Sequence, residues 1–143
     1  MNVTQLSLFL ENKPGRLQSA LKVLAGKNIN IRTLTIAEVS DFGIVRMIVT
    51  QPDEAVRALR ENHFTCSTTD VLAIELDDEP GSLERALDIF GRHGLNIEYM
   101  YAFTSRQGNR AVLVFRFDDP DAAVKVLEKG GVRVLRKEDI VNM

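Results

Sequence analysis

The chain has 143 residues, enough for one ordinary domain or two small ones. Apolar residues make up 45% of it and charged residues 27%, as in soluble globular proteins, and the net charge of −2 provides no basic field for nucleic acid or an anionic membrane. Its single cysteine, Cys66, excludes an internal disulfide, and the longest apolar runs have the length of a strand. We therefore expect a cytoplasmic protein without a signal peptide or a membrane span.

The first half of the chain predicts the order strand, helix, strand, strand, helix, strand. Alternating leucines from Leu6 to Leu10 are typical of a strand with one buried face, and the leucines from Leu17 to Leu24 form one stripe of a helix. The predicted elements are a strand over residues 3–10, a helix over 15–26, strands over 29–39 and 44–50, a helix over 52–62 and a strand over 64–69.

The same order restarts at Val71. The predicted elements are a strand over residues 71–76, a helix over 81–92, a strand over 95–104, a turn over 105–109, a strand over 110–117, a helix over 120–129, a strand over 132–135 and a short polar tail. Each half is thus an α+β unit of the ferredoxin-like type, a four-stranded antiparallel sheet with two helices on one face. We expect two domains, residues 1–69 and 70–143, that pair side by side as a pseudo-dimer because almost no linker separates them.

The two halves are an internal repeat. At a shift of 66 residues, nine positions between 6 and 36 are identical, where composition alone would give roughly two. The shift grows to 67 in the strand after the first hairpin and to 68 at Pro52 and Pro120. We therefore expect each extra residue to lie in a turn, where insertions are tolerated. The identical residues are Leu6, Leu10, Pro14, Gly15, Leu17, Ala20, Leu21, Asn30 and Ile31.

A Pro-Gly turn follows the first strand of each half, over residues 11–17 and again over 77–83. A strand that runs through such a turn into a helix leaves backbone N–H groups without helical partners at the positive end of the helix dipole. That arrangement can hold a carboxylate. A single Pro-Gly is more often only a turn and a helix start, but its recurrence in matched contexts favours a binding function.

These features resemble the ACT domain family. The resemblance is carried by Asn12-x-Pro14-Gly15-x-Leu17 after the first strand and by Asn28-Ile29-Asn30-Ile31 at the second. The second half repeats it with Asp78-x-Pro80-Gly81-x-Leu83 and Gly94-Leu95-Asn96-Ile97. It covers essentially the whole chain and is similar to stand-alone tandem ACT proteins. It implies binding of a small ligand, usually an amino acid, between paired domains, with the signal passed to an attached or regulated enzyme partner.

The resemblance also implies which residues bind the ligand. Each turn would work with the second strand of the other half. In the first site these are Asn12, Pro14, Gly15, Arg16 and Leu17 with Asn96 and Ile97, and residue chemistry adds the carboxylate of Glu11 as a partner for the ligand ammonium. In the second site they are Asp78, Pro80, Gly81, Ser82 and Leu83 with Asn30 and Ile31.

The residue types suit a bound amino acid. The N–H groups beside each turn glycine would take its carboxylate, the asparagine amides offer donors and an acceptor, and nearby carboxylates would pair with its ammonium. Local backbone bonding at a strand entry is an equally good account of Asn30 and Asn96. Since Asp77, Asp78 and Glu79 make the second turn acidic, we expect the first turn to hold the tighter site.

Partners are indicated less directly. The strands over 44–50 and 110–117 carry apolar residues on both faces while helices cover only one, so we expect a homodimer stacked sheet to sheet. His63, His93 and Cys66 do not form a metal-ligand pattern, and no cofactor loop or nucleophile–base pair is present.

Three functions compete with a non-catalytic regulatory module. One is a purely structural or dimerisation module. An acyl-phosphate hydrolase-like enzyme would need a Gly-Arg loop after the first strand, whereas Arg16 follows Pro-Gly here. An RNA-binding sheet would need stacking aromatic residues on its two central strands. Phe9 lies on one of them, but its counterpart on the other is Met47, which is not aromatic. We therefore predict neither catalysis nor nucleic-acid binding.

Overall fold

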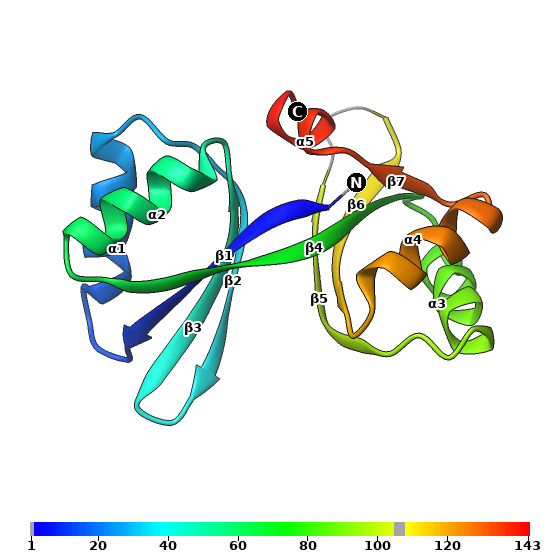
Figure 1. The fold of residues 1–143 in the computed structure, drawn as a ribbon, viewed down its shortest axis with the longest axis horizontal. Coiled ribbons are helices and arrows are strands. Elements are labelled where there is room, and N and C mark those ends of the chain that lie inside the picture. Colours follow the sequence, from blue (N-terminus) through cyan, green and yellow to red (C-terminus); the bar gives the residue numbers. More distant parts are fainter. Residues whose placement is uncertain (1, 105–107) are drawn as a thin grey trace. The chain divides into compact units, whose positions relative to one another are not determined.

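The structure is a computed structural model that describes residues 2–104 and 108–143, so part of the turn predicted over 105–109 lies outside it. The chain forms two compact units, residues 4–69 and residues 70–143 with the start of the chain, which we call the N-terminal and C-terminal units. Figure 1 labels the elements. They are β1 (Val3–Glu11), α1 (Arg16–Gly26), β2 (Ile31–Val39), β3 (Phe42–Val49), α2 (Pro52–Glu61), β4 (Thr65–Asp77), α3 (Ser82–Arg92), β5 (Ile97–Thr104), β6 (Arg110–Phe117), α4 (Pro120–Lys129), β7 (Arg133–Leu135) and α5 (Lys137–Val141).

Each unit has the βαββαβ order and an antiparallel sheet. The strand order is β2-β3-β1-β4 in the N-terminal unit, while in the C-terminal unit β4 lies between β7 and β6, and β5 is at the edge. The α+β fold class predicted from the sequence is therefore confirmed.

Both units bury their helices against one face of the sheet. In the N-terminal unit, alternate residues of β1 and β3 meet Ala20 and Leu24 of α1 and Leu59 of α2 in one core. In the C-terminal unit the core centres on Phe90 of α3, whose ring lies edge-on to Phe115 and Phe117 at centroid distances of 5.3 and 5.1 Å. The period-2 and period-3.6 patterns of the sequence point to these same faces.

The structure departs from the sequence-based expectations in three places. The strands expected over 64–69 and 71–76 form one continuous strand, β4, because the β-branched stretch around Thr69 contains no Gly or Pro to break it. The polar tail forms the short helix α5, in which the backbone N–H of Arg136 donates to Asp139 Oδ2 at 2.8 Å and Ile140 is buried.

The third departure concerns the repeat. Leu6 pairs with Met47 in the first sheet, and Leu72 pairs with Phe115 in the second. The shift is therefore already 68 throughout β3 and β6, and the intermediate shift of 67 was wrong. Both extra residues lie between the paired strands of the second hairpin, because an insertion inside a strand would move its side chains to the opposite face.

The homodimer predicted from the apolar residues on both faces of these strands stays a prediction.

Helices α1 and α3 begin in the same way. The residue before each is a glycine in the left-handed region, Gly15 at φ 84°, ψ −9° and Gly81 at φ 87°, ψ −10°. A side chain there would bring its Cβ against the following carbonyl oxygen, so this bend favours glycine.

We predict that Phe90→Ala destabilises the protein by about 3–5 kcal/mol, because it removes a fully buried ring from contact with two others. The measurement is chemical denaturation followed by circular dichroism. Phe42→Ala is the matched control, since Phe42 is 50% exposed and its truncation should change the free energy of unfolding by less than about 1 kcal/mol. Equal losses in the two variants would contradict the core assignment.

We also predict that Gly15→Ala lowers the free energy of unfolding by about 1–2 kcal/mol through backbone strain alone. No heavy atom lies within 4 Å of the added Cβ, so the change creates no clash. Gly26→Ala at the other end of α1 serves as the control. It also meets nothing, has no positive φ, and should be neutral or stabilising by up to about 1 kcal/mol. A stabilised Gly15→Ala variant would argue against the left-handed bend.

Candidate functional site

The two Pro-Gly turns have the same backbone hydrogen bonds. The N–H groups of Asn12 and Asp78 donate across the hairpin end to Asp41 and Asn109 at 2.8 and 2.7 Å. Those of Lys13 and Glu79 donate to the carbonyls of Glu11 and Asp77, those of Arg16 and Ser82 to Lys13 and Glu79, and those of Ser19 and Arg85 to Gly15 and Gly81. The duplicated sequence therefore encodes a duplicated strand–turn–helix junction.

Each junction leaves backbone donors open. Among the described residues, no protein acceptor meets the N–H groups of Leu17 and Gln18 in α1, or those of Leu83 and Glu84 in α3. Neither helix has a side-chain cap. Nothing lies within 4 Å of the position that a Cβ would take at Gly15, whereas Arg85 Nη1 lies 3.0 Å from that position at Gly81. The sequence predicted the N–H groups beside each turn glycine as donors for a carboxylate, but those of Arg16 and Ser82 are engaged with Lys13 and Glu79. The open donors begin one residue further into each helix, still at the positive end of the helix dipole.

The charged side chains of the first turn are engaged with their neighbours. Lys13 Nζ lies 2.9 Å from Glu11 Oε2, and this hydrogen bond holds the pKa of the Glu11 carboxyl below its ordinary value. The guanidinium of Arg16 lies over the ring of Phe64, 5.0 Å from its centroid, and its buried Nε has no hydrogen-bond partner among the residues that the structure describes. Leu17 is partly buried against the N-terminal core, so it anchors the start of α1 beside the turn.

The second turn is less acidic in effect than its sequence indicates. Glu79 Oε1 lies 3.0 Å from Arg85 Nη2, and Asp77 Oδ1 lies 3.2 Å from Arg110 Nη1. Of its three acidic residues, only Asp78 has no ion pair within the part of the chain that the structure describes. The two turns therefore differ less in effective charge than their sequences indicate. That the first turn holds the tighter site stays a prediction.

The two asparagines at the strand entries are exposed. Asn30 Oδ1 accepts a hydrogen bond from the N–H of Ile31 at 3.0 Å, and Thr50 Oγ1 accepts one from the N–H of Asn30 at 3.1 Å. The local-bonding account therefore holds for the side-chain oxygen of Asn30, whereas its Nδ2 meets no acceptor among the described residues. For Asn96 the described residues provide a backbone hydrogen bond alone, which its carbonyl oxygen accepts from the N–H of Asp118 at 3.3 Å.

The predicted site residues fall into one group per unit. Pro14 and Pro80 lie exposed at the two turns, Ile31 packs against the N-terminal core and Ile97 against the C-terminal one. The predicted cooperation between the turn of one unit and the asparagine of the other stays a prediction.

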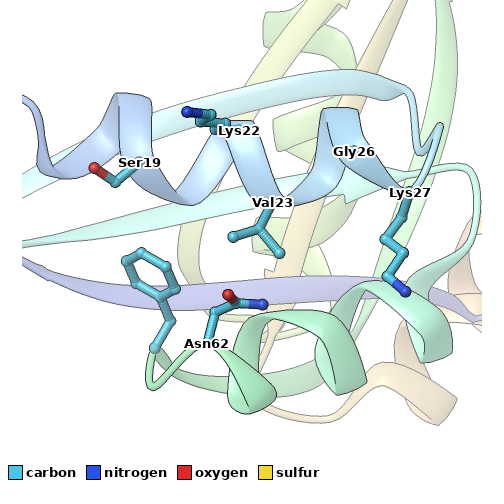
Figure 2. A pocket seen from close by; sticks show the side chains of 7 residues that line it. Ser19, Lys22, Val23, Gly26, Lys27 and Asn62 are labelled. Atoms are coloured by element: carbon cyan, nitrogen blue, oxygen red, sulfur yellow. The ribbon is translucent and has the colours of Figure 1, made fainter.

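A hollow that the sequence did not predict lies between α1 and the end of α2, with a volume of about 480 Å³. Figure 2 shows Val23 pointing from α1 towards Asn62 at the end of α2. The lining residues are Ser19, Lys22, Val23, Gly26, Lys27, Asn62 and Phe64. The spacing of its four α1 residues places them on one helix face, which is the signal that could have found it. Its two lysines are exposed, so its polar groups are loosely held.

Other kinds of site find little support in the described residues. No group of three His, Cys, Asp or Glu side chains in them is placed to hold a metal ion. None of their helices is both long and apolar enough to cross a membrane. Cys66 is buried, and burial raises the pKa of its thiol, the opposite of what a reactive nucleophile needs.

Comparison with known proteins agrees with this architecture. Residues 1–143 match the family model described as an ACT domain pair. A crystal structure of a protein from Bacteroides thetaiotaomicron is 43% identical, with 100% of this chain and 98% of that chain covered and a TM-score of 0.95. No functionally curated protein matches.

More distant solved structures share the fold. The ligand-free regulatory subunit of aspartate kinase from Thermus thermophilus is 17% identical, with 88% of this chain and 91% of that chain covered and a TM-score of 0.65. The corresponding subunit from Thermus flavus is 16% identical, with 90% and 92% covered and a TM-score of 0.62. The resemblance inferred from the duplicated Pro-Gly and Asn-Ile motifs is thereby confirmed, and the chain belongs to the ACT domain pair family.

Proposed function

We propose that this protein is a non-catalytic regulatory module that binds a free amino acid between its two ACT domains and signals to a partner protein. The observation that carries the proposal is the pair of matched junctions, each with two open backbone N–H groups beside a left-handed glycine. A carboxylate is the group that such donors and the helix dipole stabilise.

The proposal also provides partners for the ammonium group and the polar side-chain atoms of a bound amino acid. Its ammonium would lie near the carboxylate of Glu11 or Asp78, and the amide donors of Asn30 or the amide of Asn96 would bind its polar atoms. Because Gly15 carries no side chain and nothing lies within 4 Å of its Cβ position, a ligand carboxylate can approach the N–H groups there closely. At Gly81 Arg85 Nη1 lies 3.0 Å from the corresponding position, so a carboxylate there would meet the guanidinium as well.

The nature of the partner follows by analogy. The two Thermus structures are of a regulatory subunit of aspartate kinase, and they share this fold. We propose that the present chain likewise modulates an enzyme carried on a separate polypeptide. A purely structural or dimerisation module is the alternative, and it predicts no ligand.

The test is a thermal-denaturation screen of the full chain against the common amino acids. We expect at least one to raise the melting temperature. A ligand at a hundred times its dissociation constant stabilises the folded state by about 2.7 kcal/mol. A screen in which no amino acid has an effect, although the protein unfolds cooperatively, would favour the structural alternative.

We predict that Gly15→Val abolishes most of this stabilisation, because its side chain would cover the N–H groups of Leu17 and Gln18. Gly81→Val should weaken binding less, since Asp78 already disfavours a carboxylate there. Both variants carry similar backbone strain, and Gly81→Val also meets Arg85 Nη1 3.0 Å from its Cβ, so each is compared with its own ligand-free melting temperature. Gly26→Ala is the control that should bind normally. If Gly15→Val bound the ligand unchanged while Gly81→Val lost it, the ranking of the two turns would be reversed.

A further inference from the structure

A notch of about 250 Å³ in the C-terminal unit lies where β7 ends its pairing with β4. β7 pairs with Ala73, Ile74 and Glu75 only, so the last two residues of β4 line an open strand edge. Side chains from α3, β6 and the turn before β7 complete the wall. Its lining residues are Glu75, Leu76, Asp77, Ser82, Arg85, Ala86, Ile89, Arg110, Gly131, Val132 and Arg133.

Three arginines from three different elements meet at this notch. Arg133 Nη1 lies 3.1 Å and Arg110 Nη1 3.7 Å from the same oxygen, Glu75 Oε1, and Arg110 also lies 3.2 Å from Asp77. Arg85 lines the notch from α3 and contacts Glu79 at 3.0 Å. The lining itself therefore carries three positive and two negative side chains, in the half of the chain whose net charge is −4.

The guanidinium groups are positioned by ion pairs that leave some of their N–H donors free. The side chain of Glu75 is only 14% exposed, so it is a fixed acceptor that positions Arg110 and Arg133. The arginines themselves are 49–62% exposed, and each has five N–H donors. The ion pairs use only part of these donors, so the remaining N–H groups are accessible to an incoming oxyanion.

The fold does not require this cluster, as the repeat shows. By strand register and helix alignment, the N-terminal counterparts of Glu75, Arg85, Arg110 and Arg133 are Phe9, Ser19, Phe42 and Thr65. The register places Phe42 opposite Glu11 as it places Arg110 opposite Asp77. The N-terminal unit thus builds the same backbone with no charge at any of these four positions.

The notch is also opened by smaller side chains. The first residue of the helix is Arg16 in α1 and Ser82 in α3. The residue before the last strand is Phe64 in one unit and Val132 in the other, and both donate to an equivalent helix carbonyl, Leu59 or Leu127. In the N-terminal unit the Arg16 guanidinium lies over the Phe64 ring. In the C-terminal unit the smaller side chains of Ser82 and Val132 do not fill the corresponding space, which forms part of the notch.

We propose that this notch is a second binding site, specific for a small oxyanion, a carboxylate or phosphate group of a metabolite, held by Arg85, Arg110 and Arg133. The planar guanidinium fork matches both groups bidentately. The site lies within one unit and goes beyond the proposed amino-acid site, although Ser82 lies beside both.

The test is an NMR titration of the full chain with sodium phosphate, sodium sulfate and sodium succinate at ionic strength held constant with sodium chloride. We expect saturable shifts of the arginine Nε–Hε signals from the notch. Phosphate saturating at the lower concentration would indicate a phosphorylated ligand, and succinate a carboxylic acid. Shifts that grow linearly with every anion would mean that no site exists.

Arg85→Gln and Arg133→Gln should each weaken binding about tenfold or more, because each removes a charge-assisted donor. The matched control is Arg92→Gln, an exposed arginine of the same helix paired with Asp88 and outside the notch lining, which should change affinity less than about twofold. An equal loss in Arg92→Gln would overturn the proposal in favour of general attraction by surface charge. Because the probes carry no ammonium, this result is separable from that of the amino-acid screen.

Discussion

The left-handed glycine between the first strand and first helix of each unit is the constraint on which the rest depends. At Gly15 and Gly81 the chain turns so sharply that the helix begins one residue later, without a side-chain cap. The helix then starts with two N–H groups that no protein atom meets among the described residues. Every helix starts with N–H groups that lack partners within it, and the glycine at this bend has no side chain to cap them, so they remain as candidate binding donors.

Much of this was predictable because the determinants are local. The hydrophobic periods give the elements, and Pro-Gly after an alternating apolar run gives the junction. The repeat supplies the remaining information. A motif that is weak when it occurs once becomes informative when it recurs at the same place in a second unit, since two copies must satisfy the same backbone. Turn residues such as Gly15 and Gly81 were identified for this reason.

The features that sequence reasoning missed depend on contacts between distant positions. Glu75, Arg110 and Arg133 are far apart in the chain, and only the antiparallel registers of β4 with β6 and β7 bring them together. The acidic second turn was interpreted without the arginines that neutralise part of it, because Arg85 and Arg110 come from a helix face and another strand. Helix α5 is short enough that its capping contact, rather than any periodicity, defines it.

Comparing the two units separates what the fold needs from what it merely permits. The apolar positions, the glycine and the turn hydrogen bonds are repeated, so they are the requirements of this backbone. Phe9 and Phe42 in one unit occupy the positions of Glu75 and Arg110 in the other, and they are 41% and 50% exposed. Exposed aromatic groups and an ion pair have opposite solvation, so no common packing role explains both. The packing and turn geometry that both units share do not determine the residues at these positions. Divergence there can therefore give the two units different ligands without disturbing either core.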